Sequence, residues 1–441
     1  MRIRLAFILN IIVVLAVATV LTASAGAENW PQWRGPFLNG STSESDLPTT
    51  WSKTENVLWM IKMPGPGPST PIVWEDRVFV TAIEKESRKM WAICLNRADG
   101  RELWKHDMGI GFFAGNGSNS ASSSPITDGE RVYFFFGTGD LVAFDMDGGI
   151  IWQRNIEKDH GKIQIIYRYG ASLLLYQNRL YMSVMHRHTK AEAQPGQPKP
   201  VSYLLCIDPK TGKDLWKHER DTDAVGESME AYTTPYPFEG PNGSLIILAG
   251  ADYVTAHKPA SGEEVWQTFN YNPRKIKSYR LVPSVVGIDE MVIFCEPRGR
   301  GIFAIRGDSL GQILEEDVVW TARKNVPDVC SPLVMDGKLF VLDGGRRVMS
   351  CLDPKTGKIY WQDKLDVGKL QASPTGGDGK IYCISMNGEV VIVSAGDAFE
   401  VLSRIDMGEG DCRSTISAAH GQLFIRTPER LYCIEDKAGG K

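Results

Sequence analysis

The chain repeats one motif of short strands eight times, and this repetition limits the folds open to it. Each copy opens on Ser or Thr before an apolar run, passes through a tight polar turn, and ends on a strand that carries Trp. The opening marker is well formed at Thr70-Pro71, Ser124-Pro125, Thr234-Pro235, Ser331-Pro332 and Ser373-Pro374. Degenerate copies stand at Ser172-Leu173, Val282-Pro283 and Thr415-Ile416.

The Trp strands give the length of the repeat. They carry Trp59, Trp104, Trp152, Trp216, Trp266, Trp320 and Trp361, and Leu402 stands where the next Trp would fall. The seven intervals between Trp59 and Leu402 average 49 residues. Four short strands in every 40–50 residues, roughly, are typical of a propeller blade, and no segment sustains a helical apolar period. The sequence therefore predicts an all-β, eight-bladed β-propeller.

The two ends of the repeat array indicate how the ring closes. The eighth copy ends at Glu435-Asp436 without a Trp strand, whereas Asn56–Ile61 is a Trp strand with no copy before it. We expect this N-terminal strand to complete the last blade, because that pairs both ends and removes an open sheet edge. The propeller is then expected to span residues 56–441.

The N-terminus predicts export. A basic start with Arg2 and Arg4 precedes an apolar run, Leu5–Leu21, and small residues follow in Ala23-Ser24-Ala25 and Ala25-Gly26-Ala27. This pattern is typical of a cleaved signal peptide, here residues 1–27, and leaves residues 28–55 as an N-terminal extension. An uncleaved membrane anchor is the alternative reading. No Cys stands near the cleavage site to accept a lipid, so we expect a periplasmic or secreted protein without a membrane span once the segment is removed.

Charge and cysteine content exclude two classes of protein. The formal net charge is −4, becoming −6 without Arg2 and Arg4, and basic residues are scattered, which argues against nucleic acid or anionic membrane as a partner. Four of the eight cysteines share one third-strand position in different copies, two lie in second strands and two precede inner strands: Cys94, Cys206, Cys351 and Cys433; Cys295 and Cys383; Cys330 and Cys412. Packed sheets lie too far apart for disulfides, so we expect all eight to be unpaired. We expect a monomer.

The copies Asp208-Pro-Lys-Thr-Gly212-Lys-Asp-Leu-Trp216 and Asp353-Pro-Lys-Thr-Gly357-Lys-Ile-Tyr-Trp361 resemble the tryptophan-docking repeat of the pyrroloquinoline-quinone (PQQ) enzyme-like propellers. That superfamily contains quinoprotein alcohol dehydrogenases, non-enzymatic secreted propellers and the propeller lipoprotein of the outer-membrane β-barrel assembly machinery. The opening Trp30-Pro-Gln-Trp33-Arg-Gly-Pro36 resembles the start of secreted PQQ-like propellers from planctomycete-type bacteria. The resemblance implies that the seven Trp side chains dock neighbouring blades, and it does not decide the chemistry.

A quinoprotein dehydrogenase needs parts that this sequence does not supply. The resemblance implies PQQ held between a Trp and a disulfide of adjacent cysteines, with Ca²⁺ on carboxylate and amide oxygens. The chain has no Cys-Cys pair. Seven Trp side chains serve docking, Trp30, Trp33 and Trp51 precede the ring, and Trp74 lies in a turn on the opposite face, which leaves Trp91 alone to approach the funnel. PQQ with Ca²⁺ is therefore kept only under the alternative function.

One face of the ring is expected to carry the function. The loops leading into the inner strands and those joining second to third strands share this face, here called the funnel face. Charged residues gather on it: Arg168, Glu230, Arg280, Glu296, Arg298, Asp343, Arg346, Asp411 and Arg413. Converging Arg and carboxylates suit a polar ligand or a protein interface, and a solvated face with internal ion pairs is the competing interpretation.

The sequence thus predicts a non-catalytic scaffold that binds an envelope or secreted protein, or a polar ligand, through its funnel face. Its binding side chains would be Arg280, Arg298, Arg346 and Arg413, paired with carboxylates of the bound molecule. The resemblance adds a role in cell-envelope assembly, with PQQ-dependent oxidation of an alcohol or sugar as the alternative.

Overall fold

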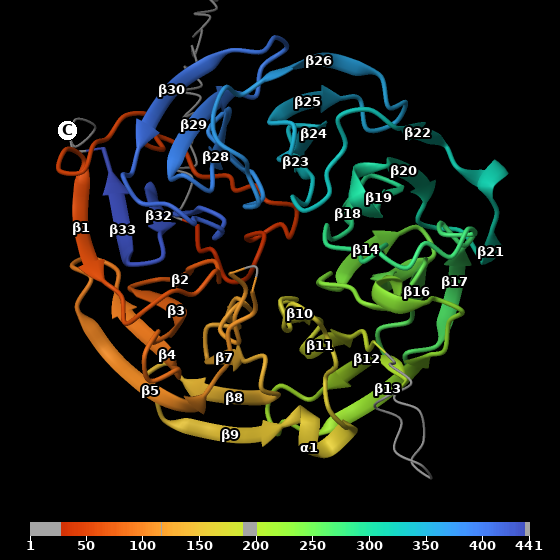
Figure 1. Cartoon of the computed structure of the whole chain (residues 1–441), viewed down its shortest axis with the longest axis horizontal. Coiled ribbons are helices and arrows are strands. Elements are labelled where there is room, and N and C mark those ends of the chain that lie inside the picture. Colours follow the sequence, from red (N-terminus) through yellow and green to blue (C-terminus); the bar gives the residue numbers. More distant parts are fainter. Residues whose placement is uncertain (1–27, 116, 188–200, 437–441) are drawn as a thin grey trace, which may run out of the picture.

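The computed structural model describes residues 28–115, 117–187 and 201–436, which form a closed ring of eight antiparallel sheets around a central axis (Figure 1). Each sheet is one blade, with its first strand nearest the axis and its fourth at the rim. The predicted eight-bladed propeller is confirmed.

The first four blades follow one another along the chain in sequence order. Blade 1 contains β2 (Ile72–Trp74), β3 (Arg77–Ile83), β4 (Lys89–Asn96) and β5 (Glu102–Ile110). Blade 2 contains β6 (Ile126–Thr127), β7 (Arg131–Phe135), β8 (Asp140–Asp145) and β9 (Ile150–Asn155). Blade 3 contains β10 (Leu174–Tyr176), β11 (Arg179–Val184), β12 (Ser202–Ile207) and β13 (Asp214–Arg220). Blade 4 contains β14 (Tyr236–Gly240), β15 (Gly243–Gly250), β16 (Tyr253–His257) and β17 (Glu264–Thr268).

The last four blades complete the ring. Blade 5 contains β18 (Val286–Ile288), β19 (Met291–Glu296), β20 (Gly301–Arg306) and β22 (Trp320–Ala322), while β21 (Gly311–Ile313) pairs in parallel with β17 of blade 4. Blade 6 contains β23 (Leu333–Met335), β24 (Lys338–Asp343), β25 (Val348–Leu352) and β26 (Ile359–Lys364). Blade 7 contains β27 (Thr375–Gly377), β28 (Lys380–Ile384), β29 (Glu389–Ser394) and β30 (Val401–Asp406). Blade 8 contains β31 (Ser417–Ala419), β32 (Gln422–Arg426), β33 (Arg430–Glu435) and β1 (Val57–Lys62).

Helical structure is slight. The described residues contain the short α-helix α1 (Ile156–His160) and 3₁₀ turns at Gly226–Met229, Pro297–Gly299 and Glu315–Asp317. Among these residues no helix has the length and apolar character needed to cross a membrane.

Blade 8 is closed by the N-terminal strand, as the sequence predicts. Strand β1 pairs antiparallel with β33, and Trp59 lies opposite Cys433. The first and last strands of the ring are therefore held in one sheet, and neither is left as an open edge.

Neighbouring blades are joined by tryptophan. The indole N–H of each of seven rim-strand residues donates to a turn carbonyl of the next blade at 2.7 to 3.1 Å: Trp59, Trp104, Trp152, Trp216, Trp266, Trp320 and Trp361. In blade 7 the expected position is one residue off, because the strand register places Ser403 rather than Leu402 where the other blades carry Trp. The second and third strands are almost continuously apolar, because adjacent blades cover both of their faces.

All eight cysteines fall within the described residues, and each is buried and unpaired, as expected. Burial raises the pKa of every one of these thiols. They are therefore protonated core side chains rather than nucleophiles.

Candidate functional site

A belt of hydroxyl groups runs around the axis from blade 1 to blade 7, at the start of the inner strands. The backbone N–H of Thr70 donates to Oγ of Ser124 in the next blade, and the pattern repeats through six successive blade pairs at 2.9 to 3.1 Å. The acceptors are Ser124, Ser172, Thr234, Ser284, Ser331 and Ser373. The repeated Ser/Thr marker of the sequence therefore marks the residues that fasten the inner strands to one another.

This belt corrects one prediction. The marker of the fifth repeat was placed at Val282-Pro283, whereas the structure puts Ser284 in the belt and Val285 after it. The loop before β18 is thus two residues longer than the repeat suggests.

A cavity of about 220 Å³ opens on the axis just above the belt. Hydroxyl-bearing residues from several blades line it, including Thr70, Ser124, Thr234, Ser331 and Thr415. Among the described residues, the wall contains no carboxylate and three arginines, which are Arg168, Arg280 and Arg413. The cavity is therefore polar, cationic and open to the funnel face.

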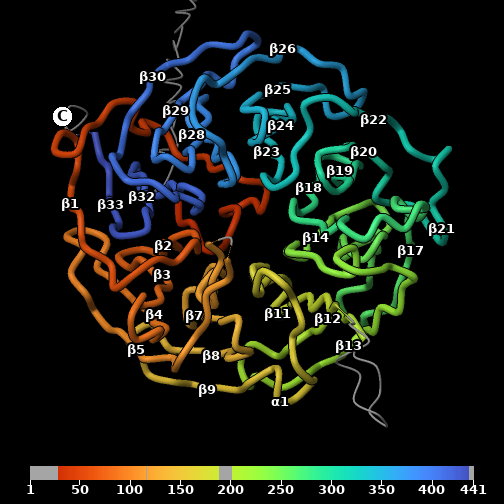
Figure 2. Tube along the Cα trace, in the orientation of Figure 1, coloured from red at the N-terminus to blue at the C-terminus, as the bar shows by residue number. Residues whose placement is uncertain are grey.

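Residues 29–48 close the opposite end of the axis as a plug. Backbone bridges join Trp30 to Val73 of blade 1 and Ser41 to Gly376 of blade 7, so the segment crosses from one blade to the other. Figures 1 and 2 show this red segment running across the middle of the ring. The indole of Trp33 forms the part of the plug that lines the cavity. The cavity is consequently blind.

Arg34 anchors the plug. Its guanidinium donates to the carbonyl oxygens of Pro374 at 2.8 Å, Pro332 at 2.6 Å and Asn39 at 2.8 Å. The side chain is 3% exposed, and burial lowers the pKa of Arg34 to about 9. Since blades 6 and 7 supply two of these acceptors, the plug is tied to the ring through backbone groups.

Three of the predicted site residues meet in the cavity, and they differ in their partners. Arg280 donates to Glu227 at 3.1 Å, and Arg413 donates to Asp411 at 2.7 Å and Gln371 at 2.9 Å. Arg168 has no carboxylate within ion-pair distance among the described residues, and its buried Nε has no hydrogen-bond partner. Its guanidinium lies 5.0 Å from the centre of the Phe112 ring. Arg168 is therefore the arginine of the cavity that has no ion pair among the described residues, although its charge interacts with that of Glu157.

The remaining predicted residues lie around the cavity rather than in its wall. Asp411 holds Arg413, and Glu230 is fully buried behind the wall, where its carboxylate accepts from the N–H of Ile166 at 3.3 Å and the hydroxyl of Tyr232 at 3.2 Å. Burial raises the pKa of Glu230. This contact positions the segment that leads to Arg168.

Two further pairs are separate from the cavity. Asp343 holds the exposed Arg346 at 2.7 Å, and Glu296 holds Arg323 at 2.9 Å beside a second depression. Arg298 donates to the carbonyl of Ser278 and lies 3.5 Å from Glu227. The arginines predicted to pair with a bound molecule, Arg280, Arg298, Arg346 and Arg413, thus already have carboxylates of their own chain.

The sequence reasoning missed the aromatic part of the cavity. Trp33 was placed before the ring and Trp91 was expected to approach the funnel; instead Trp33 lines the cavity, while Trp91 lies outside its wall and donates to Glu84 at 2.9 Å. Tyr167 and Tyr232 also line it. The Trp-rich opening of the extension was the available signal for Trp33.

The donor set of the cavity does not fit a calcium–PQQ centre. Ca²⁺ binds six to eight oxygens, roughly, with carboxylates prominent among them. The described residues of the wall supply Gln371 and hydroxyl groups but no Asp or Glu. Trp33 and the arginines suit a flat anion, but the part of the wall that the structure describes contains no carboxylate to serve as a metal ligand or a base.

Two histidines stand close together in the third repeat, His186 and His188, and the sequence favours a polar loop over a metal site there. His186 is buried, and its backbone N–H donates to the hydroxyl of Ser202 at 2.9 Å. His188 lies outside the described residues.

Comparisons with known proteins agree with this architecture. The family model described as outer membrane protein assembly factor BamB matches residues 41–194 and 315–439, more than half of the chain. No curated protein matches the chain.

Solved structures with the same fold include the assembly factor BamB and two dehydrogenases. BamB from Moraxella catarrhalis has 11% identity and a TM-score of 0.57, covering 86% of this chain and 99% of its own. A europium-containing methanol dehydrogenase has 9% identity and a TM-score of 0.67, covering 92% and 98%. The quinohemoprotein alcohol dehydrogenase from Comamonas testosteroni has 11% identity and a TM-score of 0.62, covering 94% and 81%. At such low identity these likenesses show the fold alone.

Proposed function

Because this chain belongs to the family described as outer membrane protein assembly factor BamB, we propose that it is an exported, non-catalytic binding scaffold. Its central cavity captures carboxylate groups, presented by an acidic segment of an envelope or secreted partner protein or by a small polar ligand. The observation that carries this proposal is Arg168, which has no ion pair among the described residues and lies in a wall where these residues include no carboxylate.

The chemistry of the wall favours a carboxylate. A guanidinium offers a planar fork of donors that matches the two oxygens of a carboxylate. Arg168 is the arginine of the cavity that can make this pair without first releasing a carboxylate of its own chain. The hydroxyl groups of the belt can complete the hydrogen bonds of a polar guest.

The rigidity of the wall also supports binding. The belt fixes the inner strands to one another, and the plug closes the floor, so the wall is ordered before a ligand arrives. A preorganised site loses less conformational entropy on binding than a flexible one.

The second candidate function is that of a quinoprotein dehydrogenase. Trp33 below the arginines is the observation that favours it, since a flat anionic quinone stacks well on an indole. The donor set of the wall disfavours it, as described above.

Binding measurements on purified, tag-free protein separate these functions. Calorimetry would compare citrate, a poly-glutamate peptide and PQQ with and without Ca²⁺. We expect one site for citrate or for the peptide, and the preferred probe distinguishes a small ligand from an acidic protein segment. The Arg168→Met variant should lose this binding, whereas Arg306→Met on the opposite face, where Arg306 pairs with Glu290 and Asp308, should keep it.

Two results would overturn the proposal. Equal affinity of Arg168→Met and the unaltered protein for the carboxylate probes would remove Arg168 from the site. Tight PQQ binding that requires Ca²⁺ would favour the dehydrogenase.

A further inference from the structure

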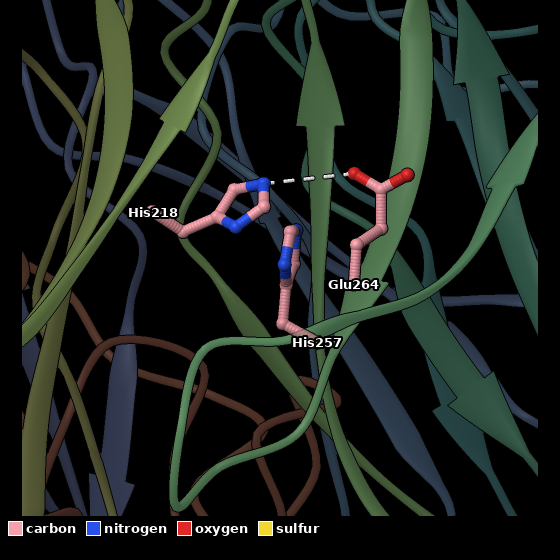
Figure 3. A group of neighbouring side chains, drawn as sticks. All are labelled: His218, His257 and Glu264. Carbon is pink, nitrogen blue, oxygen red and sulfur yellow. Dashed lines mark ion pairs between the residues drawn. The ribbon is translucent and has the colours of Figure 1, made fainter.

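A cluster of two histidines and a glutamate lies between blades 3 and 4, away from the central cavity. His218 belongs to β13 of blade 3, while His257 ends β16 and Glu264 begins β17 of blade 4. Their ligand-type atoms all lie within 4.8 Å of one another, and His218 Nε2 is 3.7 Å from Glu264 Oε2. Figure 3 shows the His257 ring standing between the other two side chains. Residues from two blades thus present three metal-ligand groups to one point.

The equivalent place between blades 1 and 2 shows what packing alone requires. His106 follows Trp104 by two positions, as His218 follows Trp216, and it stacks on Phe144 with ring centroids 4.6 Å apart. Phe144 lies opposite Ile150 across its blade, whereas His257 lies opposite Glu264. Blade 4 therefore has an imidazole and a carboxylate where blade 2 has two apolar side chains.

Other blades repeat the apolar choice. The residues that share the position of His257, at the same register shift between third and fourth strands, are Leu95, Ile207, Leu352 and Val393. A buried histidine at this position is not needed to close a blade interface. Its presence next to a second histidine and a glutamate brings together three side chains that can bind a metal ion.

The hydrogen bonds of His257 fix its tautomer and place the lone pair of the imidazole on Nε2. Its Nδ1 lies 3.2 Å from the carbonyl oxygen of Gly262, which can only accept, so Nδ1 carries the hydrogen. Nε2 is then the acceptor, and the hydroxyl of Thr255 lies 2.9 Å from it.

Metal-binding histidines in proteins are commonly oriented by a hydrogen bond from the ring nitrogen that does not bind the metal to an acceptor such as a backbone carbonyl. Here the position of that carbonyl is itself fixed, because the docked indole of Trp216 packs directly on Gly262. A Cβ added to Gly262 would lie only 2.5 Å from the indole ring. The ring of His257 is therefore held in the orientation that a metal ion would need.

We propose that His218, His257 and Glu264 bind a zinc ion that fastens blade 3 to blade 4. Two imidazoles and one carboxylate are a donor set that Zn²⁺ takes in proteins, with metal–ligand distances of about 2.0–2.2 Å and a tetrahedral geometry. The side chains of His218 and Glu264 are 28% and 34% exposed, so water can occupy the fourth position. The neighbouring buried Arg220 donates to the carbonyl of Gly250, and its positive charge acts on His257.

Metal titration of tag-free, chelator-treated protein tests the proposal. We expect one equivalent of Zn²⁺ to bind by calorimetry, Co²⁺ to give the strong visible bands of a tetrahedral site, and Zn²⁺ to raise the melting temperature. The His257→Phe variant reproduces the Phe144 arrangement of blade 2 and should fold. Its Zn²⁺ affinity should fall at least about 100-fold, because a ligand rather than a supporting residue is lost.

His106→Phe is the matched control, since it removes a histidine from the equivalent interface that has no second histidine or glutamate. It should leave Zn²⁺ affinity and the Co²⁺ spectrum unchanged. Glu264→Gln should weaken binding and alter the spectrum. The proposal is overturned if the unaltered protein binds no Zn²⁺ at tens of micromolar, or if His257→Phe and His106→Phe bind it equally well.

Discussion

The indole N–H of Trp152 donates to the carbonyl oxygen of Pro209 at 2.8 Å, and its ring covers Gly212 three residues further on. Blade 2 is thereby fastened to the turn of blade 3 by one hydrogen bond and one aromatic face. Five of the seven docking tryptophans cover a glycine in this way.

Truncating a docking tryptophan should separate these two contributions. Trp152→Ala removes the ring and the bond, and we expect a loss of about 3–5 kcal/mol in the free energy of unfolding. Trp152→Phe keeps most of the ring and removes the indole donor, while the hydroxyl of Tyr133 still donates to the Pro209 carbonyl at 3.3 Å, so we expect a cost of about 0.5–1.5 kcal/mol. Urea denaturation followed by circular dichroism measures both. Equal losses in the two variants would show that the ring contributes little.

The glycine beneath the indole offers a second, independent measure of docking. Gly212 and Gly337 both have a φ of +70°, so a side chain strains the backbone alike at both. A Cβ on Gly212 would lie 2.6 Å from the Trp152 ring, whereas one on Gly337 would meet nothing within 4 Å. Gly337→Ala should cost about 1–2 kcal/mol, and Gly212→Ala about 1–3 kcal/mol more. Identical stabilities of the two variants would contradict this packing.

The plug depends on a buried charge. Arg34→Met leaves three carbonyl oxygens without their donor, and we expect a loss of about 2–5 kcal/mol. The plug should also become sensitive to proteases, which limited proteolysis with mass spectrometry would detect. Arg346→Met is the control, because Arg346 is 63% exposed and its ion pair with Asp343 should contribute about 0–1 kcal/mol. A plug as resistant in Arg34→Met as in the control would refute this account.

Asp252 predicts a pH dependence of stability. It lies fully buried between β15 and β16, accepts from Asn272 at 3.1 Å and from Ser228 at 3.3 Å, and has Lys275 and Asp223 nearby. Burial raises the pKa of Asp252 from 3.8 to about 6. The folded state therefore binds the proton more tightly than the unfolded state.

The sign of this effect follows directly. Below pH 4 both states are protonated, and as the pH rises from 4 to 6 the unfolded state alone gives up its proton. The contribution of Asp252 should then fall by about 3 kcal/mol in total and stay level above pH 6. Denaturation of the unaltered protein and of Asp252→Asn from pH 4 to 8 should show this difference in slope. Parallel stability curves would contradict it.

Features that recur in several blades were predictable, because the same residues recur at equivalent positions in the sequence repeats. The Trp strands and the Ser/Thr markers recur, and closure through Trp59 follows from the two incomplete ends of the array. The exception was the fifth marker, where Ser284 lies two residues from the expected Val282 and only the belt reveals the register.

Features that occur once were not predictable in this way. Arg34 donates hydrogen bonds to carbonyl groups about 300 residues away in the sequence. Every residue has a backbone carbonyl, so no pattern of side chains can predict which of them will accept. The contact between His218 and His257 depends on how blades 3 and 4 pack against each other, which the sequence does not show. The sequence does show that His257 is a histidine at a strand position that is apolar in other repeats. The pairing of Arg280 with Glu227 likewise needed the folded loops.

Closure through β1 ties the timing of folding to synthesis of the whole chain. Strand β1 and the plug are made early, but β33 and the acceptors of the plug in blades 6 and 7 are made late. During that interval the early strand exposes backbone groups that could pair with another chain. The residues that emerge first therefore need the most protection from aggregation. That need ends when the last blade is synthesised and its strand β33 pairs with β1.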